Sequence, residues 1–358
     1  MREVVINKNE AGQRLDKFLR KYMSQAGSGF LYRMLRKKNI VLNGAKADGS
    51  EKLKEGDLVR LFLSEETISS FQEVAASYPY KPLDVLYLGP NVAIVNKPAG
   101  MLSQKAEAED ISLNEYLIGW LLQEEKIFEK DLATFKPSVC NRLDRNTSGL
   151  VLCGVSLAGS QALSALLKGR GIRKEYLCLV LGNVKNDAYV KGFLRKDERT
   201  NQVSISETER PGDQPIETSY QVVAHGEHTT LLKVHLITGR THQIRAHLAS
   251  LGHPVVGDKK YGAIAGDANS GYGRKDGQQA AGNGGRSDKA FRSPAFKDPV
   301  PARHQMLHAW RVTFPQVASA DEPMAAISEL AGKSITAPVP DAMKTCLIKE
   351  GISHGDVE

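Results

Sequence analysis

A short polar loop that runs directly into a buried strand most constrains how this chain can fold. Residues 141–150 read N-R-L-D-R-N-T-S-G-L, and the apolar run Val151-Leu152-Cys153 follows at once. This order of polar and apolar residues predicts a loop docked on the edge of a sheet. The loop places one carboxylate, Asp144, between the guanidinium groups of Arg142 and Arg145.

Two roles for Asp144 follow from its neighbours. Flanking positive charge favours the ionised form of a carboxylate, so Asp144 could act as a nucleophile or a base without further activation. Alternatively, Asp144 is a structural residue that braces a turn through the hydroxyls of Thr147 and Ser148. The loop residues alone leave both interpretations open.

The length and composition indicate a globular protein with a large core. The chain has 358 residues, of which 41% are hydrophobic, so we expect two or three domains. No run approaches the roughly 18 apolar residues that a membrane-spanning helix needs, and residues 1–7 contain no apolar signal core. These features predict a cytoplasmic location and no membrane partner.

The cysteines and histidines do not form a recognisable metal pattern. Four cysteines occur at positions 140, 153, 178 and 346, without a Cys-x-x-Cys pair, so we expect reduced, buried thiols. His242 and His247 are five residues apart with no carboxylate between them, which disfavours a zinc site. We therefore predict no metal site.

Positive charge is concentrated near the N-terminus. The net charge of +7 and the pI near 9.0 suggest a polyanionic partner. Between Asp16 and Asp48 there is no acidic residue, whereas eight are cationic: Lys17, Arg20, Lys21, Arg33, Arg36, Lys37, Lys38 and Lys46. Such a one-sign surface could follow the phosphates of a nucleic acid.

The same segment has the periodicity of a small α+β module. Apolar residues recur at helical spacing over 15–22 and again over 30–35. Strands are expected at 40–42 and 58–63, with a tight turn at Asn43-Gly44. We place a domain over 12–66, followed by a polar linker from 64 to 80.

A second domain is expected over residues 80–320. Strand patterns occur at 85–88, 92–95, 173–181, 203–205, 220–223, 229–236 and 305–315, with helices at 110–123 and 158–167. Residues 263–301 contain hardly any large apolar side chain, so we expect a disordered insertion. The remaining 321–358 are interpreted as a tail, with a short helix at 324–330 and a surface strap at 338–340.

The loop resembles the signature of one enzyme family. Residues 142–149, Arg-Leu-Asp-Arg-Asn-Thr-Ser-Gly, are similar to the R-L-D-x-x-T-S-G motif of the RluA-type pseudouridine synthases. The resemblance implies that Asp144 is the catalytic residue. It also implies an α+β fold with a mixed, mainly antiparallel sheet. One position departs from the family, which usually has histidine where this chain has Asn141.

Three further segments resemble the same family in the same order. Residues 96–100 match its N-K-P-x-G segment, and 174–182 match K-x-Y-x-x-x-V-x-G, which implies that Tyr176 stacks on the target base. Residues 239–247 match G-R-T-H-Q-I-R-x-H, which implies that Arg245 pairs with Asp144 and that Ile244 packs beside the base. Arg240 and His242 of that motif, together with Arg142, are assigned to RNA binding.

Residues 14–63 resemble an S4 RNA-binding domain. In this interpretation Arg33, Arg36, Lys37 and Lys38 of the second helix and the following turn contact RNA. A basic face without a ligand is the alternative. The S4-like module ahead of the synthase domain resembles the ribosomal large-subunit branch more than the stand-alone tRNA enzymes.

Together the resemblances imply a cofactor-free, monomeric enzyme that isomerises uridine to pseudouridine in RNA, with 23S ribosomal RNA favoured as substrate. A synthase that acts on tRNA remains an alternative. A non-catalytic RNA-binding or ribosome-assembly factor is another, and Asn141 is the one feature in its favour. A metal-dependent RNA hydrolase would need carboxylates that the sequence does not place beside the histidines.

Overall fold

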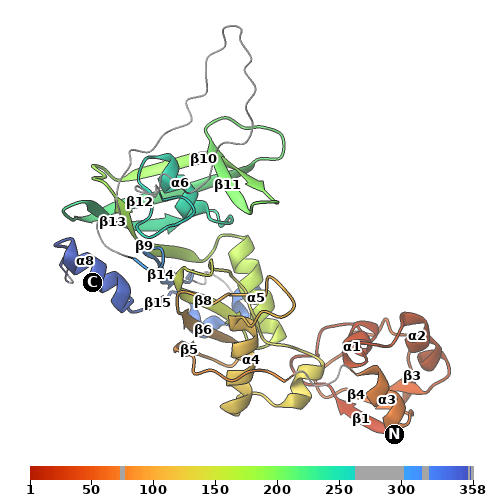
Figure 1. The fold of residues 1–358 in the computed structure, drawn as a ribbon. Helices are drawn as coiled ribbons and strands as arrows, with labels where there is room; N and C mark the ends of the chain where they lie inside the picture. The colour runs from red at the N-terminus through yellow and green to blue at the C-terminus, as the bar shows by residue number, and fades with distance from the viewer. Residues whose placement is uncertain (73–76, 263–301, 317–321, 354, 356–358) are drawn as a thin grey trace.

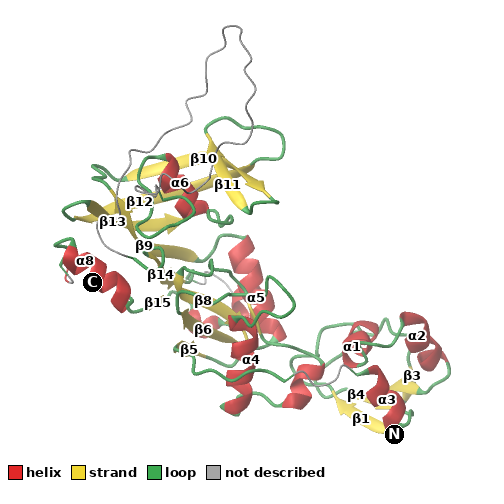
Figure 2. Ribbon diagram, in the orientation of Figure 1, coloured by secondary structure: helices red, strands yellow, loops and turns green. Residues whose placement is uncertain are grey.

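The computed structural model describes residues 1–72, 77–262, 302–316, 322–353 and 355. It contains a small N-terminal unit at one end and a larger unit built on a long sheet (Figures 1 and 2). The insertion expected over 263–301 lies outside the described residues. No described helix is long and apolar enough to cross a membrane.

The N-terminal unit packs three helices against a four-stranded antiparallel sheet. The strand order is β1-β4-β2-β3. Its elements are β1 (Arg2–Val5), α1 (Leu15–Tyr22), α2 (Ser28–Arg36), β2 (Ile40–Leu42), β3 (Ala45–Lys46), β4 (Leu58–Leu61) and α3 (Glu65–Phe71). Both predicted helices and both predicted strands are confirmed. The turn at Asn43 and Gly44 has φ values of 49° and 77°, as a two-residue hairpin requires.

This unit extends beyond the segment from 12 to 66 at both ends. Strand β1 pairs with β4, although its side chains alternate only between exposed and half-buried. The start of the expected linker is instead the helix α3, whose Ile68 is fully buried in the core of the unit. One buried residue per helix gives no detectable periodicity, so the sequence did not reveal α3.

The larger unit is organised around an 11-stranded sheet. Its main path runs β11-β10-β12-β13-β9-β14-β8-β6-β5, with β15 beside β14 and β7 beside β8. Every pairing is antiparallel except that of β14 with β8, which confirms the expected α+β fold. The strands are β5 (Val85–Leu88), β6 (Val92–Lys97), β7 (Ser138–Val139), β8 (Ser148–Gly154), β9 (Arg173–Leu181), β10 (Ala188–Asp197), β11 (Gln202–Ser206), β12 (Gln214–His225), β13 (Thr229–Leu236), β14 (Leu307–Thr313) and β15 (Ser334–Thr336).

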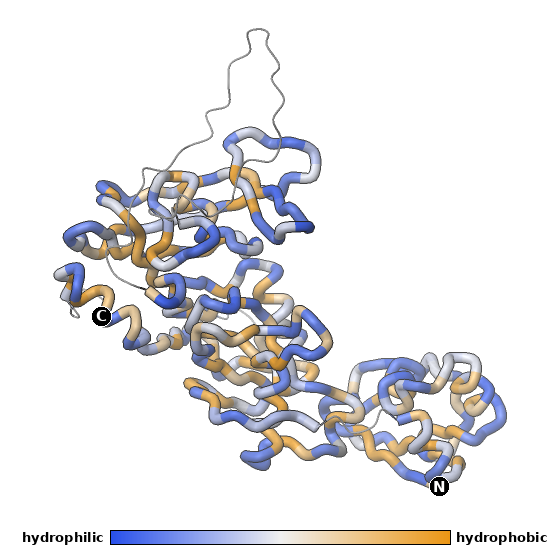
Figure 3. The backbone as a smooth tube through the Cα atoms, in the orientation of Figure 1, coloured by the Kyte–Doolittle hydropathy of each residue, from blue (hydrophilic) through white to orange (hydrophobic). Residues whose placement is uncertain are grey.

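The central strands are rich in hydrophobic residues (Figure 3), and these residues belong to core clusters on both faces of the sheet. One face packs against α4 (Leu113–Gln123) and α6 (Gln243–Ser250), and the other packs partly against α5 (Leu157–Lys168). The helix predicted at 110–123 is confirmed as α4, and its Leu113, Leu117 and Leu121 are buried in the core. The side chains of Ser112 and Glu115 form a capping box that starts this helix. A 3₁₀ turn, η1 (Glu129–Ala133), follows α4.

The C-terminal residues belong to the large unit rather than forming a separate tail. The helix expected at 324–330 is divided into α7 (Glu322–Ala325) and η2 (Ser328–Leu330). Strand β15 then pairs with β14, and α8 (Asp341–Lys349) buries Met343, Cys346 and Leu347 beneath the sheet. Three apolar residues in a polar helix are a weak signal, so the sequence analysis missed α8.

Gly149 lets β8 approach β14 closely. Its φ is +108°, and a Cβ atom there would lie 2.2 Å from the carbonyl oxygen of Ala309. Glycine is therefore required by both the backbone conformation and the parallel pairing of these strands.

We predict that Gly149→Ala lowers the free energy of unfolding by about 3 kcal/mol or more, through the clash and the backbone strain. Gly212→Ala is the matched control, because Gly212 has φ +89° with no atom within 4 Å of the added Cβ. Gly212→Ala should lower the free energy of unfolding by only about 1–2 kcal/mol. Denaturant titration measures both, and equal losses would contradict the close-packing account.

Candidate active site

The loop that carries Asp144 connects β7 to β8 and is tied to the sheet at its start. The backbone N–H of Leu152 donates to Asn141 Oδ1 at 2.7 Å. The hydroxyl of Ser103 donates to the carbonyl of Leu143 at 2.9 Å and accepts from its N–H at 3.0 Å. An amide at position 141 thus anchors the loop, which gives this departure from the family motif a structural role.

Lys97 fixes the other side of the loop. Its side chain is completely buried, and Nζ lies 3.0, 2.8 and 3.2 Å from the carbonyl oxygens of Pro98, Met101 and Arg145. Burial lowers the pKa of Lys97 to about 7, while the charge of Asp144 acts in the opposite direction. Three carbonyl oxygens match the three donors of an ammonium group, so Lys97 holds the signature loop to the 96–100 segment.

Two residues near β14 secure the end of the loop. The amide of Gln305 donates to the hydroxyl of Thr147 at 2.7 Å. Ser148 Oγ lies 2.9 Å from Nδ1 of the fully buried His308. Burial lowers the pKa of His308 to about 4, so its imidazole is neutral at neutral pH.

Asp144 faces Arg245, which belongs to α6 about one hundred residues later in the chain. Arg245 NH1 donates to Asp144 Oδ2 at 2.7 Å, while Nε and NH2 donate to Asp258 at 2.6 and 2.9 Å. The side chain of Asp258 is fully buried, that of Arg245 is 8% exposed and that of Asp144 is 24% exposed. One guanidinium thus joins a buried carboxylate to one that solvent can reach.

The charges of this triad stabilise one another. Burial would raise the pKa of Asp258, but the hydrogen bonds and the charge of Arg245 lower it below its usual value. Burial would likewise lower the pKa of Arg245, whereas Asp258 and Asp144 raise it. Both groups therefore stay charged near neutral pH, and the bidentate pair fixes the direction of the guanidinium.

His242 and Tyr261 complete the surroundings of Asp144. His242 Nε2 lies 3.9 Å from Asp144 Oδ2, and Nδ1 lies 2.9 Å from the hydroxyl of Tyr261. The guanidinium of Arg245 also lies over the Tyr261 ring, 5.1 Å from its centroid. His242 itself has a left-handed backbone with φ 53° immediately before α6.

Tyr176 and Ile244 form part of the apolar core next to this cluster. Their exposed fractions are 6% and 5%, and both belong to the same hydrophobic cluster. Burial raises the pKa of Tyr176, and the charge of Asp144 adds to the effect. Asp144 therefore lies at the boundary between charged groups and an apolar wall.

Comparison with known proteins shows the family. Residues 91–250 match the model of a family described as RNA pseudouridylate synthase. The chain is 30% identical over 275 residues to the ribosomal large subunit pseudouridine synthase C of Vibrio parahaemolyticus. The aligned residues cover 75% of this chain and 82% of that protein. This chain belongs to the RNA pseudouridylate synthase family.

A second relative and a solved structure agree with this assignment. The protein of the same name from Escherichia coli K12 is 31% identical over 272 residues, covering 72% of this chain and 79% of the relative. The structure of human RNA pseudouridylate synthase domain containing 4 is similar in fold, with a TM-score of 0.51 at 18% identity. That similarity covers 75% of this chain and 93% of the human one.

The structure places some of the predicted site residues of the synthase beside Asp144 and leaves the side chains of others exposed. Arg245 and His242 each lie within ion-pair distance of Asp144, and Tyr176 and Ile244 belong to the apolar core beside them. Arg142 and Arg240 are exposed side chains. Arg33, Arg36, Lys37 and Lys38 are exposed on the separate N-terminal unit.

Asp258 and Tyr261 are the site residues that sequence reasoning missed. Both lie in residues 253–262, to which the sequence analysis gives no role. The one local signal was an aspartate directly after the apolar run Val255-Val256-Gly257, since a carboxylate at the end of a buried run needs a partner.

The histidines of the 235–247 segment go to different surroundings. His235 lies on β13, His242 contacts Tyr261, and His247 Nδ1 lies 3.1 Å from the hydroxyl of Thr218. Among the described residues, no three histidine, cysteine or acidic side chains are grouped as metal ligands would be.

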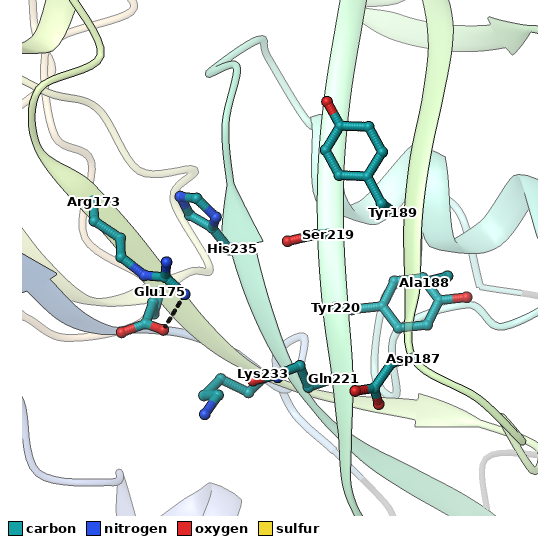
Figure 4. Close-up of a pocket in the computed structure, with 10 residues that line it drawn as sticks. All are labelled: Arg173, Glu175, Asp187, Ala188, Tyr189, Ser219, Tyr220, Gln221, Lys233 and His235. Atoms are coloured by element: carbon teal, nitrogen blue, oxygen red, sulfur yellow. Dashed lines mark hydrogen bonds and ion pairs between the residues drawn. The ribbon is translucent and has the colours of Figure 1, made fainter.

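A separate depression of about 370 Å³ lies on the sheet at β9, β10, β12 and β13 (Figure 4). Residues that line it include Tyr189, Lys233 and His235. Arg173 and Glu175, which also line it, form an ion pair of 3.1 Å that neutralises both charges. Asp144 and Arg245 are not among its lining residues, so it is distinct from the cluster around Asp144.

Proposed function

We propose that this enzyme converts uridines of large-subunit ribosomal RNA, the 23S RNA, to pseudouridine, with Asp144 as the catalytic carboxylate. One observation carries the proposal: in a chain of this family, Asp144 is held by an arginine and remains partly accessible to solvent. Arg245 holds its Oδ2 at 2.7 Å, while a quarter of the side chain remains accessible. Relatives named for the ribosomal large subunit support the choice of RNA.

The carboxylates near the site favour isomerisation over hydrolysis. Isomerisation breaks the C1′–N1 bond, turns the uracil and joins C5 to C1′ without consuming water. Glycoside hydrolysis generally requires a second carboxylate that activates water or donates a proton. Asp258 is the nearby second carboxylate, but both of its oxygens accept from Arg245 and its side chain is fully buried. Asp258 is therefore unsuited to activating water.

The apolar wall provides a place for the flipped uracil. A base taken out of a helix loses a few kcal/mol of stacking. Contact with an aromatic side chain such as Tyr176 recovers about 1–3 kcal/mol. Ile244 would pack against the same base, and the exposed Arg142 would fill the space that the base leaves in the RNA.

The structural role of Asn141 weakens the alternative of a non-catalytic binding factor. Its side chain anchors the loop by a hydrogen bond of 2.7 Å to the backbone of β8, and Asp144 keeps its arginine partner. We further propose that the enzyme acts as a cytoplasmic monomer without a cofactor.

We predict that Asp144→Asn abolishes pseudouridine formation, lowering tritium release from 5-labelled uridine in RNA by about 10³-fold or more. RNA affinity should stay within a few-fold, because the amide preserves the shape. Asp187→Asn is the matched control: Asp187 accepts from the Val222 N–H at 2.8 Å and lines the separate depression of Figure 4.

The same variants test the substrate in cells that lack the gene. Chemical mapping should show pseudouridines of 23S RNA that disappear on deletion, return with wild type and Asp187→Asn, and stay absent with Asp144→Asn. Sites that disappear from tRNA instead would select the tRNA alternative. Full restoration by Asp144→Asn would contradict the catalytic assignment.

We also propose that the N-terminal unit is an S4-like domain that binds RNA through Arg33, Arg36, Lys37 and Lys38. All four are exposed on α2 or in the turn after it. No acidic residue lies between Asp16 and Asp48 to oppose this surface.

Neutralising Lys37 and Lys38 to glutamine should reduce the slope of log affinity against log salt by about 1.5, since each phosphate contact contributes about 0.7–0.9. The control neutralises Lys344 and Lys349 of α8, far from α2 (Figure 1). Equal changes for the two pairs would show that only net charge matters and that the α2 surface is no RNA site.

A further inference from the structure

We infer that Tyr261 is a positioning residue that acts through His242: its hydroxyl orients the imidazole so that the Nε2–H group faces Asp144. The inference rests on the proposed catalytic role of Asp144. It concerns a different feature, namely which nitrogen of His242 carries the proton and what sets that choice.

The hydrogen bonds of Tyr261 determine the tautomer of His242. The backbone N–H of Val203 donates to the Tyr261 hydroxyl at 3.0 Å, so that oxygen already accepts one proton. The hydroxyl has one proton to donate, and His242 Nδ1 lies 2.9 Å away. Donation to Nδ1 requires an unprotonated Nδ1, and a neutral imidazole then carries its proton on Nε2.

His242 is held neutral by its surroundings. Its side chain is 10% exposed, and burial lowers its pKa. The nearby charges of Arg245 and Lys260 lower the pKa further, whereas those of Asp144 and Asp258 oppose the shift. At neutral pH, Nε2 is therefore a donor on an uncharged ring.

This donor faces the oxygen of Asp144 that Arg245 also holds. Nε2 is 3.9 Å and Arg245 NH1 is 2.7 Å from Oδ2. Two donors on Oδ2 would fix the carboxylate plane and leave Oδ1 for the nucleotide. A shift of about 1 Å in the loop would bring Nε2 within the normal hydrogen-bond range of 2.7–3.2 Å.

Tyr261 is itself fixed by the residues that hold Arg245. Asp258 Oδ1 accepts from the Tyr261 backbone N–H at 3.2 Å and from Arg245 NH2 at 2.9 Å. The Tyr261 ring lies against the guanidinium. Residues 258–261 thus orient both partners of Asp144: Asp258 holds Arg245, and the Tyr261 hydroxyl holds His242.

The test compares Tyr261→Phe with Tyr87→Phe in the full-length enzyme. Tyr261→Phe removes the hydroxyl but keeps the ring over Arg245. We expect kcat to fall about 10–100-fold, as for other residues that orient a functional side chain, with KM within threefold. Tyr87 donates its hydroxyl proton to Glu329 at 3.1 Å and packs in a different core cluster, so Tyr87→Phe should retain the wild-type rate.

Nitrogen NMR of ¹⁵N-histidine gives a readout that does not depend on activity, with His242→Gln to assign the signal. Wild-type His242 should show protonated Nε2, bare Nδ1 and a pKa below its ordinary 6.5. In Tyr261→Phe the two tautomers should mix. Protonated Nδ1 in the wild type would overturn the inference even if Tyr261→Phe failed to fold. Unchanged signals and kcat in a folded Tyr261→Phe would also overturn it. If Asp144 is not the catalytic residue, Asp144→Asn will keep its activity, and this result does not depend on the tautomer of His242.

Discussion

The ion-pair chain Asp144–Arg245–Asp258 is the interaction on which the site depends. It joins the loop before β8 to two segments that follow about one hundred residues later, the first turn of α6 and the turn after residue 257. Removing one member of such a buried cluster leaves an uncompensated charge and costs about 3–5 kcal/mol. These ion pairs therefore specify where the loop before β8 meets α6, and evenly packed apolar contacts would specify this less sharply.

The sheet provides the rigid frame that makes this pairing possible. Gly149 allows the parallel contact of β8 with β14, and Lys97 binds the loop carbonyl of Arg145 from inside the core. Asn141 closes the base of the loop against β8. Asp144 is thus carried by a short loop with anchors at both ends. The carboxylate on such a loop keeps one orientation while solvent can still reach it.

Sequence patterns predicted the strands and helices whose formation depends on residues that are neighbours in the chain. Periodicity predicted the strands β6 and β9 and the helix α4. The pairing of Asp144 with Arg245 followed from the family resemblance. The partnerships of Asp258 and Tyr261 depend on contacts across the fold, which no local pattern encodes. The elements β1, α3 and α8 were missed because each buries few side chains and is stabilised by packing on a larger body.

We propose that Arg245 acts as a planar fork that orients Asp144, and not merely as a positive charge. Single-turnover rates of Arg245→Ala and Arg245→Lys across pH 5 to 9, with RNA affinity measured in parallel, test it most directly. We expect a large loss of rate for alanine and partial recovery for lysine, which restores the charge but cannot bind Asp144 and Asp258 in a fixed plane. RNA affinity should change far less than rate. Wild-type rates for both variants throughout this pH range would contradict the account.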